Sequence, residues 1–177
     1  MPLSDAAVAS DLAQAGLLFV KRIQVDVVVP LPEGKGAASC GPEHGRFDED
    51  ETVSVDDPEM PAKINASWWR MATEYGLLDD QREFLLRVDY RDPQAIEPEG
   101  AWVRVRLDED WDLAGSGATA LRSWFAGLFT DRFVPEFTMV SIDGRTLLNT
   151  TVWGNGTVSS IVVCPDRRNG PASAPGG

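Results

Sequence analysis

The sequence predicts an α+β fold in which one curved, mainly antiparallel sheet of five to seven strands carries two or three helices. Its 177 residues suit a single domain, expected over 1–165 and followed by a disordered tail over 166–177. Strands and helices do not alternate as repeated crossovers and no glycine-rich phosphate loop is present, so a doubly wound parallel sheet is not expected. Two tight-turn signals near the end of the chain predict a closing three-stranded antiparallel meander.

The N-terminal segment predicts a helix and then a long strand. The helix covers 4–15, with Ser4 or Asp5 as its N-cap and Gly16 as its stop. Residues 17–29 alternate apolar and polar side chains, which is the period of a half-buried antiparallel strand. A Pro-Leu-Pro sequence then ends the strand.

Residues 33–62 predict an unusually long loop. Between 43 and 59 this loop holds eight acids against one arginine, a net charge of −7 out of the chain's −12. Because the stretch has few apolar residues to bury, we expect it to be solvated and mobile without a partner. The functional alternative is that it grips a basic partner or closes over the sheet.

The middle of the chain predicts a helix followed by two strands. The helix covers 66–78, with Asn65 or Ser67 as its cap. Alternating apolar residues predict strands over 83–90 and 101–108. The outward face of the second strand carries Trp102, Arg104 and Arg106.

Residues 118–129 have the strongest amphipathic pattern in the sequence. Leu121, Trp124, Phe125 and Leu128 recur at the i, i+3, i+4 and i+7 spacing of one helix face. We therefore expect a core helix that packs on the concave face of the sheet and buries Trp124.

The meander is predicted over 134–164. Asp-Gly and Asn-Gly pairs separate its apolar runs, and both central residues of a type I′ turn need a positive φ. With Asn155-Gly156 as a two-residue loop, Trp153 lies opposite Val158. Neither face of the meander is fully polar, so we expect one face to pack on helices. The other face is then a half-covered wall, a ligand pocket or an interface.

Composition favours an acidic cytoplasmic protein. The hydrophobic content of 43% and charged content of 25% are ordinary for a globular domain. A net charge of −12 repels nucleic-acid phosphates and anionic lipids, so neither nucleic acid nor a membrane is an expected partner. The first residues lack a signal-peptide pattern, and no apolar run approaches the roughly 20 residues of a spanning helix. Two cysteines, Cys40 and Cys164, are expected to be free thiols.

We expect no metal site and no cofactor. Cys40 and His44, with Glu43 and Asp48 nearby, lack the second ligand pair of a structural zinc site. The acids of 108–112 begin like a calcium loop but miss its required Gly and Glu. His44 is the single histidine, so if it lies outside the site, Ser-His-Asp and Cys-His catalysis are both excluded.

The leading functional hypothesis is a protein-binding module without catalytic activity. An immunity- or antitoxin-like neutraliser of a basic partner is one version. Acidic residues would attract such a partner, and exposed aromatic residues would hold it. The candidate partner-binding residues are Asp48, Glu49, Asp50, Glu51, Trp102, Arg104, Arg106 and Trp153.

Two alternatives stay open. One is a small-molecule pocket protein or a cofactor-free enzyme of isomerase or cyclase type. There Asp26, Asp89 or Glu136 would act as a general base whose pKa burial raises. The other is an oligomeric structural subunit that uses the second sheet face between its own copies. A cavity lined by one polar cluster would favour the pocket, and an exposed aromatic patch would favour an interface.

Overall fold

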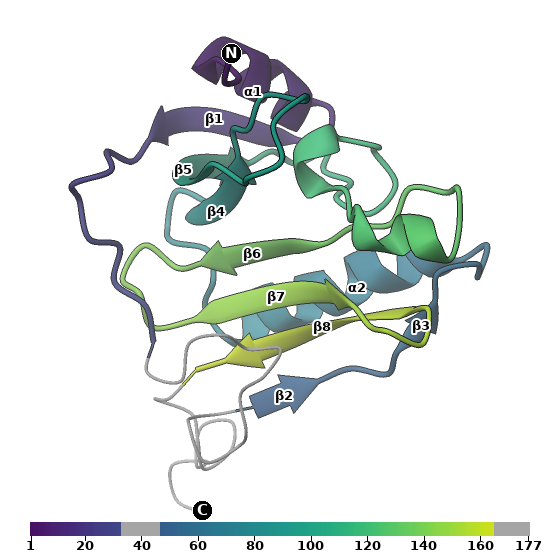
Figure 1. The fold of residues 1–177 in the computed structure, drawn as a ribbon. Helices are drawn as coiled ribbons and strands as arrows, with labels where there is room; N and C mark the ends of the chain where they lie inside the picture. The colour runs from purple at the N-terminus through teal and green to yellow at the C-terminus, as the bar shows by residue number, and fades with distance from the viewer. Residues whose placement is uncertain (33–46, 165–177) are drawn as a thin grey trace, which may run out of the picture.

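The computed structural model describes residues 1–32 and 47–164, without the side chains of 47–49. Within these residues, two α-helices accompany eight strands that pair throughout in antiparallel fashion. The strand order is β1-β5-β4-β6-β7-β8-β2, and β3 also pairs with β8 (Figure 1). The predicted α+β fold with a mainly antiparallel sheet is confirmed. The predicted tail over 166–177 lies outside the described residues.

Helix α1 (Asp5–Ala13) and strand β1 (Leu17–Arg22) open the fold. The Ser4 hydroxyl accepts a hydrogen bond from the amide of Ala7 at 3.1 Å, as predicted for the N-cap. Gly16 follows the helix with a φ of +77°, a left-handed conformation that favours glycine. The chain therefore turns from helix to strand where the sequence predicts.

Strand β1 is shorter than the predicted strand over 17–29. It lies at the edge of the sheet and pairs with β5 (Gly100–Leu107), where Arg22 already lies opposite Val103. Residues after Arg22 soon run past the beginning of β5 and leave the sheet. Val25 is 95% exposed there. The apolar alternation predicted a strand for which the sheet has no pairing partner.

The acidic segment 33–62 is not one continuous loop, which corrects the prediction. Its strands β2 (Phe47–Glu49) and β3 (Val53–Ser54) both pair with β8 (Thr157–Val163). Backbone hydrogen bonding to this strand overrides the solvation that the charges favour. Residues 33–46 lie outside the described residues.

Helix α2 (Met60–Glu74) begins at residue 60 and not at 66. Pro61 lies in its first turn, where a missing amide hydrogen is tolerated. Asn65 and Ser67, the predicted caps, lie inside the helix. The Asn65 amide donates to a carboxylate in the loop after β5, and the Ser67 hydroxyl donates to Asp50 at 2.6 Å. Both side chains thus bind other segments and do not cap α2.

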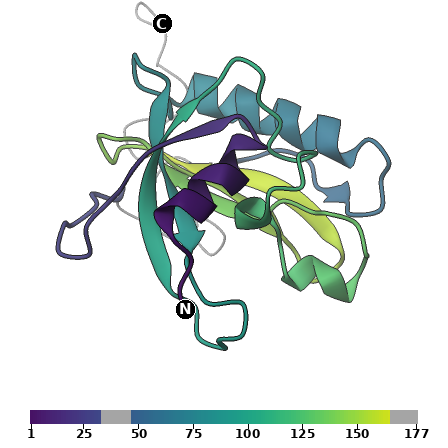
Figure 2. The same cartoon turned by 90° about the horizontal axis from the view of Figure 1, so that it is seen from above.

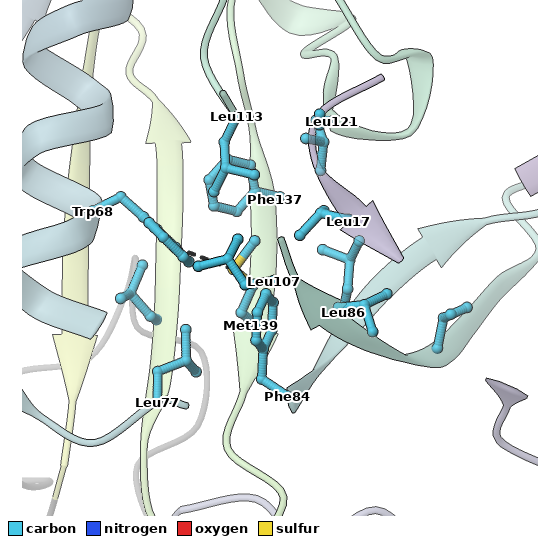
Figure 3. Packing of buried hydrophobic residues seen from close by; sticks show 14 of the residues in the cluster. Leu17, Trp68, Leu77, Phe84, Leu86, Leu107, Leu113, Leu121, Phe137 and Met139 are labelled. Atoms are coloured by element: carbon cyan, nitrogen blue, oxygen red, sulfur yellow. Dashed lines mark hydrogen bonds between the residues drawn. The ribbon is translucent and has the colours of Figure 1, made fainter. Parts of the chain in front are cut away.

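Strands β4 (Glu83–Asp89) and β5 form the hairpin predicted from their alternation. Helix α1 packs beside β1, and α2 packs along β7 and β8 (Figures 1 and 2). Both helices contribute to one main core. Trp68 of α2 is fully buried there, as predicted, and its ring nitrogen donates to the Met139 sulfur at 3.1 Å (Figure 3). Buried neighbours include Leu17, Leu77, Phe84, Leu86, Leu107, Leu113 and Phe137.

The prediction of a core helix over 118–129 is wrong. Two short 3-10 helices, η3 (Thr119–Leu121) and η4 (Phe125–Leu128), take its place. Between them the backbone is extended and bonds to residues 134–136. Trp124 is 66% exposed as a result. The neighbouring strand edge takes up backbone groups that an α-helix would need for its own hydrogen bonds.

Strands β6 (Phe137–Val140), β7 (Leu147–Val152) and β8 pair in sequence order. Residues 153–156 connect β7 to β8; the Trp153 amide donates to the Thr157 carbonyl at 2.7 Å, which leaves a three-residue turn over 154–156, and Gly156 has a positive φ. This longer loop shifts the predicted register by one residue. Val152, and not Trp153, lies opposite Val158.

Candidate ligand-binding cleft

The sheet divides between β4 and β6. Strand β4 pairs with β5 along its whole length, but its other edge pairs with β6 at Leu85 and Leu86 alone. Residues 87–89 have no described strand partner on that side. The two strands diverge there, as Figure 1 shows.

The segment between η3 and η4 holds this gap open. Residues 121–123 lie along 134–136, in the place that a continuing strand partner would occupy. Asp11 of α1 holds the start of this segment, because its carboxylate accepts hydrogen bonds from the amides of Thr119 and Ala120 at 2.8 and 2.7 Å. The gap is therefore built into the hydrogen bonding of the fold.

A cleft of about 780 Å³ fills the gap and opens to solvent. Strand alternation gives it two kinds of wall. Val8, Val88 and Phe137 line it from the side of the main core. Thr138 and Thr151 line it from the opposite face of the sheet. A bound molecule would meet apolar carbon on one side and hydroxyl groups on the other.

The carboxylates of the lining are engaged in structural hydrogen bonds. Glu136 accepts the Ser123 hydroxyl at 2.9 Å and the amide of Val152 at 2.8 Å, one on each oxygen. Asp89 accepts two backbone N–H groups of the β4–β5 connection, each at 2.9 Å. Asp26, the third general-base candidate from the sequence, is exposed and outside the cleft. Asp89 and Glu136 therefore stabilise the walls of the cleft.

The arginines of the lining differ in what they contact. Arg91 pairs with the Asp89 carboxylate at 3.2 Å. Arg87 extends across β5, where its guanidinium lies 5.5 Å from the centre of the Trp102 ring. Arg122 forms no ion pair with a described residue. Arg87 likewise forms no ion pair with a described residue, but its guanidinium is packed over Gly100 of β5, which leaves Arg122 as the better placed of the two for a ligand.

The exposed aromatic surface lies next to the cleft. We call Trp124, Phe125, Leu128 and Phe129 the η4 patch; their side chains are 66%, 41%, 76% and 36% exposed. The rings of Phe125 and Phe129 meet edge to face at 5.5 Å. Trp124 also lines the cleft, and the Arg122 guanidinium lies 5.5 Å from the centre of its ring. Patch and cleft therefore share one side chain.

The acids predicted to bind a partner lie at the other edge of the sheet. Asp48 and Glu49 belong to β2, whose backbone pairs with β8. The Asp50 carboxylate is already engaged, because Arg70 of α2 binds it at 2.8 Å. Glu51 is exposed. Part of the acidic stretch thus anchors α2 and is not free for a partner.

The predicted aromatic anchors Trp102 and Trp153 lie on the sheet face opposite the main core. Both are half-buried against a second apolar cluster. The Trp153 ring nitrogen donates to the Ser159 hydroxyl at 2.8 Å. The cluster consists of Val140, Leu147, Ile161 and Val163. The structure thus brings the two tryptophans to one face and covers half of each.

Arg104 and Arg106 are engaged as well. Both bind the carboxylate of Glu83, at 2.5 and 2.7 Å, and this carboxylate is 3% exposed. The hydrogen bond from Arg106, followed by that from Arg104, holds the pKa of Glu83 below its ordinary value although burial opposes the shift. The two arginines therefore neutralise a buried acid of their own chain.

Sequence reasoning named Asp89 and Glu136 but missed most of the other cleft residues, Arg122 above all. Arg122 lies inside the segment 118–129, for which the apolar spacing predicts a core helix that does not form. Two signals pointed away from that helix: Ser123 on the edge of the apolar stripe and Gly127 in the last turn, both poor helix formers. No pattern in the sequence locates the divergence of β4 from β6.

Only some of the other predicted site residues lie in the described part of the chain. Cys164 is a buried free thiol, whereas Cys40, Glu43 and His44 lie outside the described residues. In the described part of the chain, no three His, Cys, Asp or Glu side chains are grouped so that they could hold a metal ion. No helix there is long and apolar enough to cross a membrane.

No protein-family model matches this chain, and no curated protein or solved structure matches it either. The geometry of the cleft and of the η4 patch is therefore the basis for the function proposed below.

Proposed function

We propose that this protein binds a small organic molecule in the cleft between β4 and β6. The cleft itself carries the proposal. Its volume of about 780 Å³ lies within the range typical of small-molecule sites, roughly 300–1,000 Å³. Its lining combines apolar walls with a few polar groups, which is the usual composition of such sites.

We assign the cleft to binding and not to acid–base catalysis. A general base needs a carboxylate oxygen within reach of the proton that it removes. Asp11 and Glu136 use both oxygens on hydrogen bonds to the wall segments, and Asp89 is bonded to its own loop and to Arg91. Their role in this proposal is to keep the cleft in shape.

Filling the cleft tests the proposal. Ala6 and Ala7 are both exposed on α1, and of the two Ala7 lines the cleft. Naphthalene derivatives of different charge should perturb the NMR amide signals of Val8, Thr119 and Thr138 in the wild type. Ala6→Trp should preserve these perturbations, and Ala7→Trp should abolish them because the indole occupies the cleft. Unchanged perturbations in Ala7→Trp, or perturbations elsewhere on the chain, would show that the proposal is wrong.

A second candidate function is protein binding in the cytoplasm, and the η4 patch favours it. Exposed apolar patches of this kind mark interaction surfaces. The basic partner suggested by the net charge of −12 belongs to this candidate. Leu128 is 76% exposed within the patch, and Ile96 is 92% exposed away from it. If the patch binds a protein, a pull-down from the native cytoplasm should lose that protein with Leu128→Asp and retain it with Ile96→Asp. Equal capture by both variants would argue against this candidate.

A further inference from the structure

We infer that the ligand of the cleft is an organic anion, a carboxylate carried on an apolar ring system, and that Arg122 recognises the carboxylate. This inference rests on the proposed binding function and adds the ligand's chemistry and the residue that selects it. The observations that support it are the hydrogen bonds already used by the lining, the position of Arg122 and the apolar wall facing it.

Hydrogen bonds already made determine what the lining can offer to a ligand. The carboxylates of Asp11, Asp89 and Glu136 accept backbone or hydroxyl donors of the walls. A cationic ligand would have to share these carboxylates with the donors that they already bind, and Asp89 also with Arg91. The guanidinium of Arg122, in contrast, has no acid partner among the described residues. An anionic ligand would give the Arg122 guanidinium the acid partner that it lacks among the described residues.

Arg122 is held on a fixed backbone although it lies between two short 3-10 helices. Its amide donates to the Thr119 carbonyl at 3.1 Å, and its backbone bridges to Pro135. Both neighbours are anchored: Leu121 is fully buried, and Ser123 is 4% exposed. A rigid backbone reduces the entropy lost when the side chain binds a ligand.

Trp124 is the aromatic neighbour of the Arg122 guanidinium. The centre of its ring lies 5.5 Å from the Arg122 guanidinium carbon, a cation–π contact. A guanidinium that stacks on a ring with its flat face keeps its in-plane N–H groups, which match the two oxygens of a carboxylate. Trp124 itself is 66% exposed, so the pair stands at the rim, where a charged group can stay partly hydrated.

The remaining walls account for the apolar part of the ligand. Val8, Val88 and Phe137 come from the core side of the cleft and present carbon surface. A flat ring system would bury its area against them, at about 25 cal/mol for each Å² removed from water. A carboxylate at the rim with a ring inside therefore satisfies both kinds of wall.

Three probes with one naphthalene body test the inference: 2-naphthoate, 2-naphthamide and 2-naphthylmethylammonium. NMR titration of the full chain gives the Kd of each probe for the wild type, Arg122→Gln and Arg87→Gln. Arg87 is the matched control, because it also lines the cleft but its guanidinium is packed over Gly100 of β5. In the wild type, naphthoate should bind roughly tenfold more tightly than naphthamide, as a charge-assisted hydrogen bond allows. Arg122→Gln should remove this preference and leave the Kd of naphthamide unchanged, and Arg87→Gln should preserve it.

The possible results separate this inference from the proposed function. If naphthamide or the ammonium probe binds the wild type as tightly as naphthoate, the anion inference is overturned and the cleft remains a binding site. An equal loss in Arg87→Gln and Arg122→Gln would overturn the assignment to Arg122. If no probe perturbs the cleft amides, both proposals are overturned. Unchanged naphthamide binding in Arg122→Gln also shows that this variant is folded.

Discussion

Helix α2 and the segment 118–129 have similar amphipathic sequences and adopt different structures. Each presents a tryptophan on a predicted apolar helix face. In α2 that tryptophan, Trp68, is fully buried, whereas Trp124 is 66% exposed. The same pattern thus leads to the centre of the core in one case and to the rim of a cleft in the other.

The difference lies in what is next to each segment. Helix α2 packs with its side chains on the sheet, so its backbone is free to form helical hydrogen bonds. Residues 121–123 lie beside 134–136, and Ser123 and Glu136 each donate a backbone hydrogen bond across this pair at 2.8 Å. Amphipathic spacing therefore predicts a helix reliably only where no strand edge competes for the backbone.

The largest effect on stability should come from replacing Trp68 with alanine, and the same substitution at Trp124 is the comparison. Trp68 contacts three other aromatic rings, with the centre of the nearest, Trp111, at 5.1 Å. Trp68→Ala should lower the free energy of unfolding by about 3–5 kcal/mol, because it leaves a cavity in the main core. Trp124→Ala should cost less than about 1 kcal/mol, as exposed positions do. Urea unfolding of both variants measures the difference, and a large loss for Trp124→Ala would mean that the segment is packed as the sequence predicted.

Ser123 tests what holds the non-helical segment in place. Its hydroxyl donates to Glu136 at 2.9 Å and accepts the amide of Ala126 at 3.1 Å, and the side chain is buried. Ser123→Ala should lower the free energy of unfolding by about 1–3 kcal/mol, because it leaves buried polar groups without a partner. Ser116 is the control, since it is less buried and accepts a single amide at 3.3 Å. If the two serine variants lose equal stability, side-chain bonds of Ser123 do not hold the segment.

The sequence predicts the parts of this fold that depend on local periodicity. The alternation in 83–90 and 101–108 identifies β4 and β5, and the stripe around Trp68 identifies the core face of α2. The start of α2 was missed, because Asn65 resembles a cap and instead binds the loop after β5. Local signals therefore place elements better than they place their ends.

The candidate site depends on long-range pairing and was not predictable in the same way. Asp11 binds η3 from more than a hundred residues away in the sequence, and Glu136 binds β7. The cleft exists because β4 stops pairing with β6 after Leu86, a property of the assembled sheet. Charge and aromatic character alone predict the partner-binding residues, and several of these side chains bind other residues of the same chain, as Arg104 binds Glu83.

The smallest effect should come from a polar contact at the start of α2, the counterpart there of Ser123. Asp57 accepts the ammonium group of Lys63 at 2.7 Å and the amide of Glu59 at 2.8 Å. The hydrogen bond from Lys63, and then that from Glu59, holds the pKa of Asp57 below its ordinary value of 3.8. The folded state therefore favours the ionised carboxylate. The stability that this adds is present above the ordinary pKa and is lost as the pH falls below it.

Asp57→Asn should thus lower the free energy of unfolding slightly near neutral pH, and this difference from the wild type should disappear on acidification. Because the ion pair is solvent-exposed, the change should be smaller than that of Ser123→Ala. Asp56→Asn is the matched control, because Asp56 is exposed and its substitution removes the same charge. Urea unfolding of the three proteins from about pH 6 to about pH 3 makes the comparison. If Asp56→Asn and Asp57→Asn change stability equally at every pH, net charge is the cause and the contact with Lys63 contributes nothing specific to the start of α2.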